Sequence, residues 1–245
     1  MDIYSNPKLY DSIHSNYKWD YTLIEYFAKK HEGPVLELAS GTGRLATPIL
    51  KLRLDYTGLE RSEIFLKEAK KKFKRKASFI LGDMRSFYLG LSFDFIFIGF
   101  NSFLHNLSTK EAKSCLKCVL NHLSPKGKFL LSIFIPNTEF LYRDVKKLYP
   151  ATDFFEFENS KCRILERNEY NFDSQINHLK WYLEKDGKLD SVEYHYSMRM
   201  FYPHEMDILF QESGFIIEDK FGDYDLSPLD QKSDMQIYLC KKSDA

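Results

Sequence analysis

Two hydrophobic periodicities alternate along residues 35–134 of this chain. Short apolar runs begin at Val35, Tyr56, Ala77 and Phe93, and a glycine or a polar residue follows each run closely. Between them lie segments in which apolar residues recur every three or four positions, as in EAKSCLKCVLNHL at 111–123. The short runs predict buried strands, and the longer segments predict amphipathic helices. Their alternation predicts βαβ units that build a parallel sheet.

A different pattern begins after Pro136. Apolar and polar residues alternate in CRILERNEYNF (162–172) and in INHLKWYLEKDGKLDSVEYHYSMRMF (176–201), which contains the turn pair Asp186-Gly187. This alternation predicts an antiparallel meander. A helix from about His204 and a hairpin joining 215–221 to 235–242 are expected to complete the chain. At the other end, residues 8–30 show broken helical spacing and are expected to be helical.

The strand that begins at Val35 leads into a glycine-rich turn and a helix, VLELASGTGRLA. Gly41 and Gly43 allow a sharp turn and a close approach of the backbone to a ligand. With Ala46 they satisfy the loose G-x-G-x-x-G/A pattern of dinucleotide sites, so the turn fits two cofactor classes. Glu37 precedes the glycines, and a carboxylate there suits a cationic ligand better than pyrophosphate.

Polar residues follow the next three predicted strands. Glu60 stands 17 residues after Gly43, near the offset of about 20 expected of an acid that binds ribose hydroxyls. Asp83 ends the third strand and Asn101 the fourth. Carboxyl ends of parallel strands share one edge of a sheet, so these side chains are expected in one crevice.

At these residues the chain resembles the class I S-adenosylmethionine-dependent methyltransferases, in particular small-molecule enzymes with an N-terminal Tyr-Asp segment and a late antiparallel lid. The shared motifs are E-x-x-x-G-x-G at 37–43, the acid Glu60, Gly-Asp-Met at 82–84, FNSFLHNL at 100–107, LSPKGKFLLSIF at 123–134 and FYPHEMDILFQESGF at 201–215. Ala39 departs from the pattern, because many members carry a glycine there.

The resemblance implies an α/β fold with a Rossmann-like, seven-stranded, mostly parallel sheet and an antiparallel C-terminal strand. We expect residues 1–30 to form an N-terminal helical cap and residues 136–201 a small antiparallel β lid. Residues 31–135 and 202–245 would then form the cofactor-binding domain. Aromatic residues of the cap and the lid are expected to roof a substrate cavity or to fill a second small core.

The cofactor implied is S-adenosyl-L-methionine, with S-adenosyl-L-homocysteine as its product. Glu60 would accept the ribose hydroxyls, Asp83 the adenine amine with Met84 on the ring, and Glu37 would orient the amino acid portion. The residues expected to bind the cofactor are Tyr10, Tyr17, Trp19, Glu37, Ala39, Gly41, Thr42, Gly43, Arg44, Glu60, Arg61, Asp83, Met84, Phe100, Asn101 and His105.

Methyl transfer from a sulfonium is an in-line displacement, so positioning can supply most of the acceleration. For a hydroxyl or ammonium acceptor a general base would help, and His105 is the first candidate, with Tyr17 a weaker one. The expected activity is methyl transfer to an N or O nucleophile of a small molecule. Two alternatives stay open, an NAD(P)-dependent oxidoreductase and a non-catalytic protein that binds the same cofactor or acts as a scaffold.

Charge and motif content indicate which classes of partner the chain is expected to bind. The 245 residues carry a formal net charge of +0, which points to no polyanionic partner. The basic run at 67–76 lies on a predicted helix and is typical of a solvated face, and no N/D-P-P-Y/F motif of nucleic-acid enzymes follows the fourth strand. We therefore expect a small-molecule acceptor, no nucleic acid, no membrane, and a monomer or homodimer.

Two further features bear on location and metals. No stretch approaches the ~20 apolar residues of a membrane span and MDIYSNPKLYD lacks a signal-peptide layout, so a cytoplasmic protein is expected. Cys115 and Cys118 form C-x-x-C, but no second pair stands at zinc-site spacing. We expect ordinary helix cysteines and no metal site.

Overall fold

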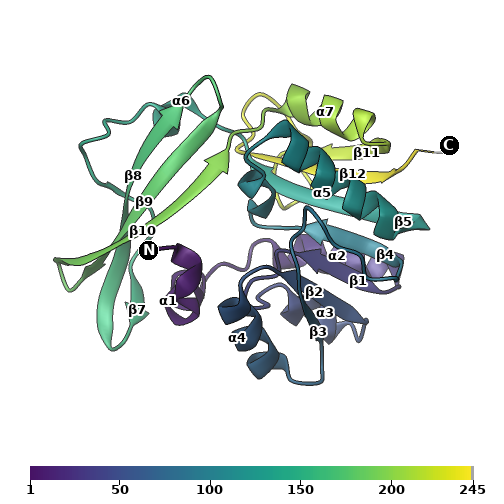
Figure 1. Ribbon diagram of the computed structural model, residues 1–245, viewed down its shortest axis with the longest axis horizontal. Coiled ribbons are helices and arrows are strands. Elements are labelled where there is room, and N and C mark those ends of the chain that lie inside the picture. Colours follow the sequence, from purple (N-terminus) through teal and green to yellow (C-terminus); the bar gives the residue numbers. More distant parts are fainter. Residues whose placement is uncertain (244–245) are drawn as a thin grey trace. The chain divides into compact units, whose positions relative to one another are not determined.

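The chain folds into two units, each built around its own β-sheet (Figure 1). The computed structural model describes residues 1–243. Unit 1 comprises residues 1–17 and 136–200, and unit 2 comprises residues 18–135 together with the chain from Phe201 onward. Within the described residues, no helix is long and apolar enough to cross a membrane.

Unit 2 contains a seven-stranded sheet in the order β11-β12-β5-β4-β1-β2-β3. Its strands are β1 (Val35–Leu38), β2 (Tyr56–Glu60), β3 (Ser78–Leu81), β4 (Phe93–Ile98), β5 (Leu123–Phe134), β11 (Phe215–Phe221) and β12 (Met235–Lys242). The strands from β5 to β3 pair in parallel, whereas β12 pairs antiparallel with both β5 and β11. The predicted Rossmann-like sheet with an antiparallel C-terminal strand is confirmed.

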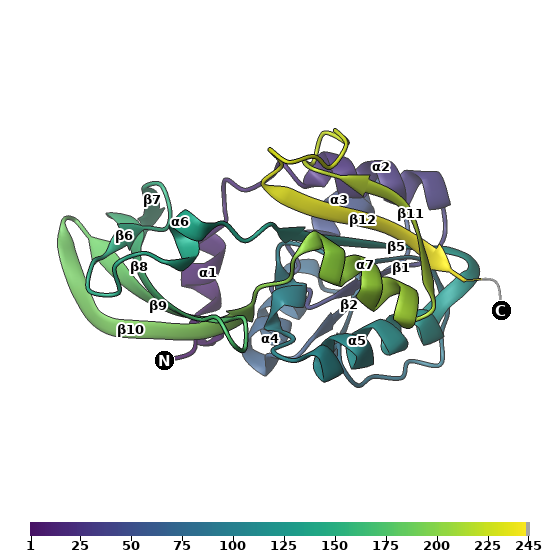
Figure 2. The ribbon, with the colours of Figure 1, turned by 90° about the horizontal axis from the view of Figure 1, so that it is seen from above.

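Helices cover both faces of this sheet. Figure 2 shows α2 and α3 on one face and α5 and α7 on the other. The helices of unit 2 are α2 (Tyr21–His31), α3 (Ala46–Lys51), α4 (Glu63–Phe73), η2 (Ser102–His105), α5 (Thr109–His122) and α7 (Pro203–Glu212). Ser62 caps α4, because its hydroxyl accepts a hydrogen bond from the N–H of Phe65.

Unit 1 is an antiparallel sheet with short helices. It contains η1 (Ile3–Ser5), α1 (Pro7–Ile13), α6 (Thr138–Leu141), β6 (Tyr149–Pro150), β7 (Phe155–Phe157), β8 (Ser160–Asn171), β9 (Ile176–Lys185) and β10 (Lys188–Arg199). Asp186 and Gly187 both have positive φ, 49° and 76°, between β9 and β10. This is the conformation that a two-residue hairpin turn requires, so the expected meander is present.

The N-terminal segment, for which we expect a helical cap over residues 1–30, contains η1, α1 and α2. The helices α1 and α2 belong to different units, because their apolar faces pack on different cores. Leu9 and Ile13 of α1 pack with the β8 and β9 side chains of unit 1, whereas Leu23 and Phe27 of α2 pack in the core of unit 2. The polar stretch at 14–20 separates them.

Candidate functional site

The carboxyl ends of four neighbouring parallel strands form one edge of the unit 2 sheet. The order β4-β1-β2-β3 places the segments that follow these strands beside one another. The following expected site residues lie on or directly after these strands: Glu37, Ala39, Gly41, Thr42, Gly43, Arg44, Glu60, Arg61, Asp83, Met84, Phe100, Asn101 and His105. Their assignment to a cofactor stays a prediction.

The turn after β1 has an unusual backbone. Ala39, Gly41 and Gly43 all have positive φ, 56°, 57° and 83°. At Gly43 a side chain is also excluded by space, because a Cβ would come within 2.6 Å of the Phe73 ring and 2.9 Å of the Phe79 ring. Ala39 holds a conformation that glycine adopts more easily, which explains why glycine is common there in the resembling family.

Glu60 ties the turn after β1 to the end of β2. Its Oε2 accepts a hydrogen bond from the N–H of Gly41 at 2.8 Å, and its Oε1 accepts one from the N–H of Ser62 at 2.7 Å. Burial raises the pKa of Glu60, and the backbone hydrogen bonds lower it in part. Each carboxylate oxygen can accept more than one hydrogen bond, so Glu60 retains capacity for ligand hydroxyls.

Glu37 is a buried carboxyl near the carboxyl end of β1, which is an inner strand of the sheet. It is 4% exposed, on a strand whose four residues are all buried. The hydroxyl of Tyr56, from the start of β2, donates a hydrogen bond to its Oε2. Burial raises the pKa of Glu37 to about 8, against the opposing effects of the Tyr56 hydrogen bond and the Arg44 charge. A nearby cation would therefore favour the ionised form.

Arg44 forms a bidentate ion pair with Asp20, which precedes α2. Its Nη1 lies 2.8 Å from Oδ1 and its Nη2 lies 2.5 Å from Oδ2. The guanidinium also lies over Phe100, with its Cζ 4.6 Å from the ring centroid, and the Tyr21 hydroxyl donates to the backbone carbonyl of Arg44. These contacts fix the end of the glycine turn against the segment that enters α2.

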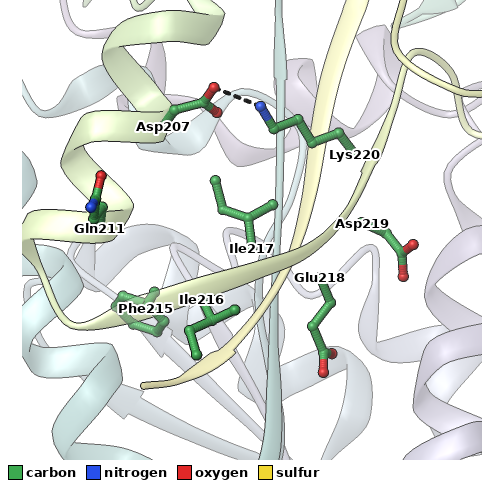
Figure 3. Close-up of a pocket in the computed structure, with 8 residues that line it drawn as sticks. All are labelled: Asp207, Gln211, Phe215, Ile216, Ile217, Glu218, Asp219 and Lys220. Carbon is green, nitrogen blue, oxygen red and sulfur yellow. Dashed lines mark hydrogen bonds and ion pairs between the residues drawn. The ribbon is translucent and has the colours of Figure 1, made fainter. Parts of the chain in front are cut away.

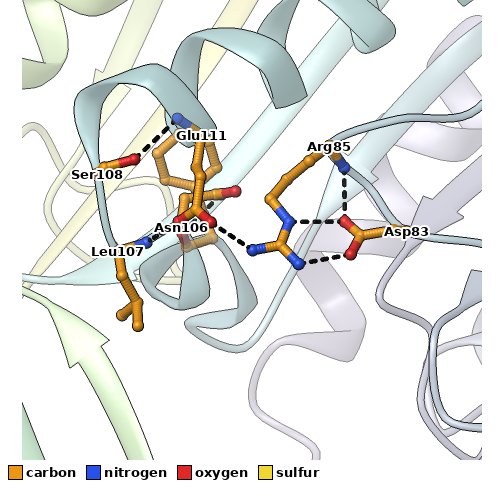
Figure 4. Close-up of polar contacts among 7 residues, drawn as sticks. Asp83, Arg85, Asn106, Leu107, Ser108 and Glu111 are labelled. Atoms are coloured by element: carbon orange, nitrogen blue, oxygen red, sulfur yellow. Dashed lines mark hydrogen bonds and ion pairs between the residues drawn. The ribbon is translucent and has the colours of Figure 1, made fainter.

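Asp83 belongs to an ion-pair network (Figure 4). The Arg85 side chain donates from Nε to Oδ1 at 2.8 Å and from Nη2 to Oδ2 at 2.5 Å, and the Arg85 N–H also donates to Oδ1. Arg85 Nη1 contacts Glu111, which in turn accepts from the N–H of Leu107. The Arg85 hydrogen bond is the main reason that the pKa of Asp83 is lowered.

Asn101 and His105 follow β4. Asn101 has a left-handed backbone, φ 64°, and its Oδ1 accepts a hydrogen bond from the N–H of Phe134 at 2.8 Å. The Asn101 side chain thus connects the ends of β4 and β5. His105 ends the short helix η2 and is half-buried. Its role as a base stays a prediction.

The three aromatic site residues expected near the N-terminus fall in different units. Tyr10 and Tyr17 belong to unit 1, and Trp19 belongs to unit 2, where it is 50% exposed. Burial and the nearby Asp153 raise the pKa of Tyr17. A raised pKa keeps this hydroxyl protonated at neutral pH, which makes Tyr17 a weaker base candidate than His105.

Three residues of this region were not among the sequence-based candidates: Tyr56, Asp20 and Arg85. Tyr56 begins an apolar strand and has the pattern of a core residue. Asp20 is 24 residues from Arg44, and no local pattern connects them. The Arg85–Asp83 contact could have been predicted, because Arg85 stands only two residues after Asp83.

A separate groove lies between α7 and β11 (Figure 3). Its lining residues are Asp207, Gln211, Phe215, Ile216, Ile217, Glu218, Asp219 and Lys220. Lys220 and Asp207 face each other across it, with Nζ 2.6 Å from Oδ2. Because β12, β5 and β4 stand between β11 and β1, this groove is not part of the candidate site.

The cysteines are free thiols, and Cys115, Cys162 and Cys240 are buried. Burial raises the pKa of Cys115. Among residues 1–243, no group of three or more His, Cys, Asp or Glu side chains is arranged to hold a metal ion.

Part of the chain matches a known domain and a curated relative. Residues 35–127 match the family described as "Methyltransferase domain". The demethylmenaquinone methyltransferase of Thermotoga maritima is 31% identical over 140 residues, a match that covers 55% of this chain and 58% of that protein. The matched region therefore spans less than two thirds of the relative.

Similar solved structures cover almost the whole chain. The CcbJ methyltransferase from Streptomyces caelestis has a TM-score of 0.78 at 22% identity, over 94% of this chain and 98% of that one. SAM-bound CalS10, described as an amino pentose methyltransferase from Micromonospora echinaspora, has a TM-score of 0.73 at 17% identity, over 96% and 97%. At these identities the likeness establishes the fold.

Proposed function

We propose that this chain transfers a methyl group from S-adenosyl-L-methionine to a nucleophile of a small molecule, as a member of the class I S-adenosylmethionine-dependent methyltransferases. Support comes from the methyltransferase domain matched at residues 35–127 and from the fold shared with solved methyltransferases. The observation that carries the proposal is the pair of buried acids, Glu37 and Glu60, beside the glycine turn. Both lie at the sheet edge where open α/β folds bind their ligands.

The residues present fit this cofactor. Glu60 is fixed by Gly41 and Ser62 with acceptor capacity to spare, as recognition of vicinal hydroxyls requires. Asp83 is held by Arg85 and offers a carboxylate to an exocyclic amine. Glu37 would offer a negative charge to the ammonium of the amino acid portion. When bound, the cofactor supplies an activated methyl group on a sulfonium.

The chain's own residues would act mainly by positioning. An amine acceptor needs only alignment with the methyl carbon and exclusion of competing water. For an ammonium or hydroxyl acceptor, His105 is the residue that would remove the proton, because it follows β4 at the same edge. We propose an amine on a polar small molecule as acceptor. Support comes from the fold shared with CalS10, which is described as acting on an amino pentose.

Unit 1 would select the acceptor. Its sheet carries aromatic and polar side chains together. Trp181 donates to Glu166 at 2.7 Å, and Arg143 lies 3.1 Å from the same carboxylate. None of these three residues is among those proposed to bind the cofactor. Specificity for the acceptor would rest with residues 136–200, which lie outside both the matched methyltransferase domain and unit 2.

Two measurements test the proposal. In thermal unfolding, S-adenosyl-L-homocysteine should raise Tm whereas NAD should not, since only a ligand that binds the native state stabilises it. The reverse result would overturn the proposal in favour of an oxidoreductase. With methyl-labelled cofactor, label should reach amino sugars and not their hydroxyl counterparts. Transfer to the hydroxyl sugars alone would overturn the amine assignment, and binding without transfer to any acceptor would favour a non-catalytic protein.

A further inference from the structure

Tyr56 lies beside the carboxyl group that the proposed function assigns to the cofactor's ammonium. We propose that Tyr56 is a positioning residue, whose hydroxyl holds the Glu37 carboxyl group in place and favours its ionised form for a cationic ligand. The inference rests on the proposed function and adds to it a residue that does not itself touch the ligand. Its support comes from strand register, burial and charge.

Strand register brings the two side chains together. Tyr56, Gly58 and Glu60 alternate along β2 and therefore share one face of the sheet. In the parallel pairing of β1 with β2, Glu37 stands opposite Gly58. A Cβ at Gly58 would come within 2.6 Å of Ser40 Oγ, so only glycine leaves this space open. On this face of the sheet the Tyr56 hydroxyl donates a hydrogen bond to Glu37 Oε2.

The surroundings of Glu37 leave its charge weakly compensated. Titratable groups face it from three elements: Tyr56 and Glu60 from β2, Arg44 from the glycine turn, and Asp20 and Tyr21 from the start of α2. The cation among these groups, Arg44, is already paired with Asp20. Burial favours a neutral carboxyl, whereas a hydrogen-bond donor favours the charged one. Tyr56 supplies that donor directly.

A purely structural role for Tyr56 is the competing explanation. The ring is 4% exposed and packs against Phe79 at a centroid distance of 5.7 Å. Phenylalanine would fill the same space but would lack the hydroxyl. The two roles therefore separate in Tyr56→Phe, because only the positioning role predicts a change in how ligand affinity depends on pH.

The experiment measures the Kd of S-adenosyl-L-homocysteine from pH 6 to 9 for the wild type, Tyr56→Phe and a control, Tyr238→Phe. Tyr238 is also buried in unit 2, and its hydroxyl lies 2.9 Å from Gln236, away from Glu37. The ligand's own amine titrates equally in all three proteins. Wild-type affinity should rise with pH and level off above about 8.

In Tyr56→Phe the midpoint of this rise should move up by about one pH unit, which weakens binding at pH 7 by about tenfold. The Tyr238→Phe control should keep the wild-type midpoint. Should Tyr56→Phe fail to fold, 3-fluorotyrosine introduced at position 56 should move the midpoint down, because its hydroxyl is a stronger donor.

The outcomes separate the two proposals. A lower Tm for Tyr56→Phe with an unchanged pH profile would overturn the positioning role and leave the cofactor assignment standing. Absence of S-adenosyl-L-homocysteine binding by the wild type across the whole range would overturn the proposed function, and the role of Tyr56 with it.

Discussion

The Glu60 carboxylate accepts a hydrogen bond from the backbone N–H of Gly41 at 2.8 Å, so one acid fixes two of the strand-end segments at once. The same carboxylate binds the N–H of Ser62 at the start of α4. The shape of the glycine turn and the position of Glu60, the proposed ribose acceptor, therefore depend on the same hydrogen bond. Substitution of Glu60 should disturb both.

Glu60→Ala is expected to weaken binding of S-adenosyl-L-homocysteine by about 1 to 3 kcal/mol, since ligand hydroxyls would lose their charged acceptor. Calorimetric titration measures the change directly. Glu63→Ala is the matched control, because Glu63 is an exposed acid three residues away on α4. Equal affinities for the two variants would remove Glu60 from the site.

Glu37→Gln should stabilise the ligand-free protein at alkaline pH. The folded-state pKa of Glu37, about 8, lies above the ordinary value of 4.5, so the folded protein holds an extra proton between these pH values. The free energy of unfolding contributed by this group then falls as pH rises through that window, by about 1.4 kcal/mol per unit of pKa difference.

Urea unfolding at pH 5 and pH 8 measures this effect as the difference between wild type and Glu37→Gln. Other carboxyls contribute equally to both proteins and cancel. We expect the free energy of unfolding of Glu37→Gln to increase relative to that of the wild type between pH 5 and pH 8. We also expect the variant to bind the cofactor more weakly than the wild type does. A difference that does not change with pH would show that Glu37 is ionised in the ligand-free protein.

Arg85→Gln should reduce selectivity for adenine. Arg85 holds both oxygens of Asp83, and without it the carboxylate loses its fixed orientation. The measurement is the ratio of Kd values for S-adenosyl-L-homocysteine and its inosine analogue, which lacks the exocyclic amine. We expect this ratio to rise by about tenfold, equivalent to about 1.4 kcal/mol, because only binding of the adenine compound is weakened. An unchanged ratio would mean that Asp83 does not read the adenine amine.

Asp20→Asn should destabilise unit 2 by about 3 kcal/mol, because it leaves the Arg44 guanidinium beside a neutral partner in a largely buried site. Glu212→Gln provides the comparison, since the Lys113–Glu212 pair has side chains 46% and 53% exposed. That exposed pair should contribute less than about 1 kcal/mol. Denaturant midpoints at constant slope would measure both, and similar losses would contradict the assigned burial effect.

Local patterns in the sequence predicted the features that depend on local chemistry. The strand runs, the turn at Gly41 and Gly43 and the Asp186-Gly187 hairpin are all present, because backbone geometry depends on neighbouring residues. The division of residues 1–30 between the two units was not predicted, because apolar spacing shows that α1 and α2 are amphipathic but not which core each one covers.

Contacts between distant residues could not be predicted in the same way. Glu37 and Glu60 were identified as acids at strand ends, but their partners were not. Tyr56 meets Glu37 only through strand register, and Asp20 meets Arg44 only through the placement of α2. The sequence could have predicted that Tyr56 and Glu60 share one face of the sheet, because Tyr56, Gly58 and Glu60 alternate on one strand.

The composition of unit 1 from two separate stretches has a consequence for engineering. The N–H of His195 on β10 donates to the carbonyl of Met1, and Leu9 packs with β8 side chains, so residues 1–17 are an integral layer of that sheet. A chimera that exchanges unit 1 must transplant residues 1–17 and 136–200 as a matched set. Transfer of residues 136–200 alone would leave their sheet without α1, the helix that packs on it.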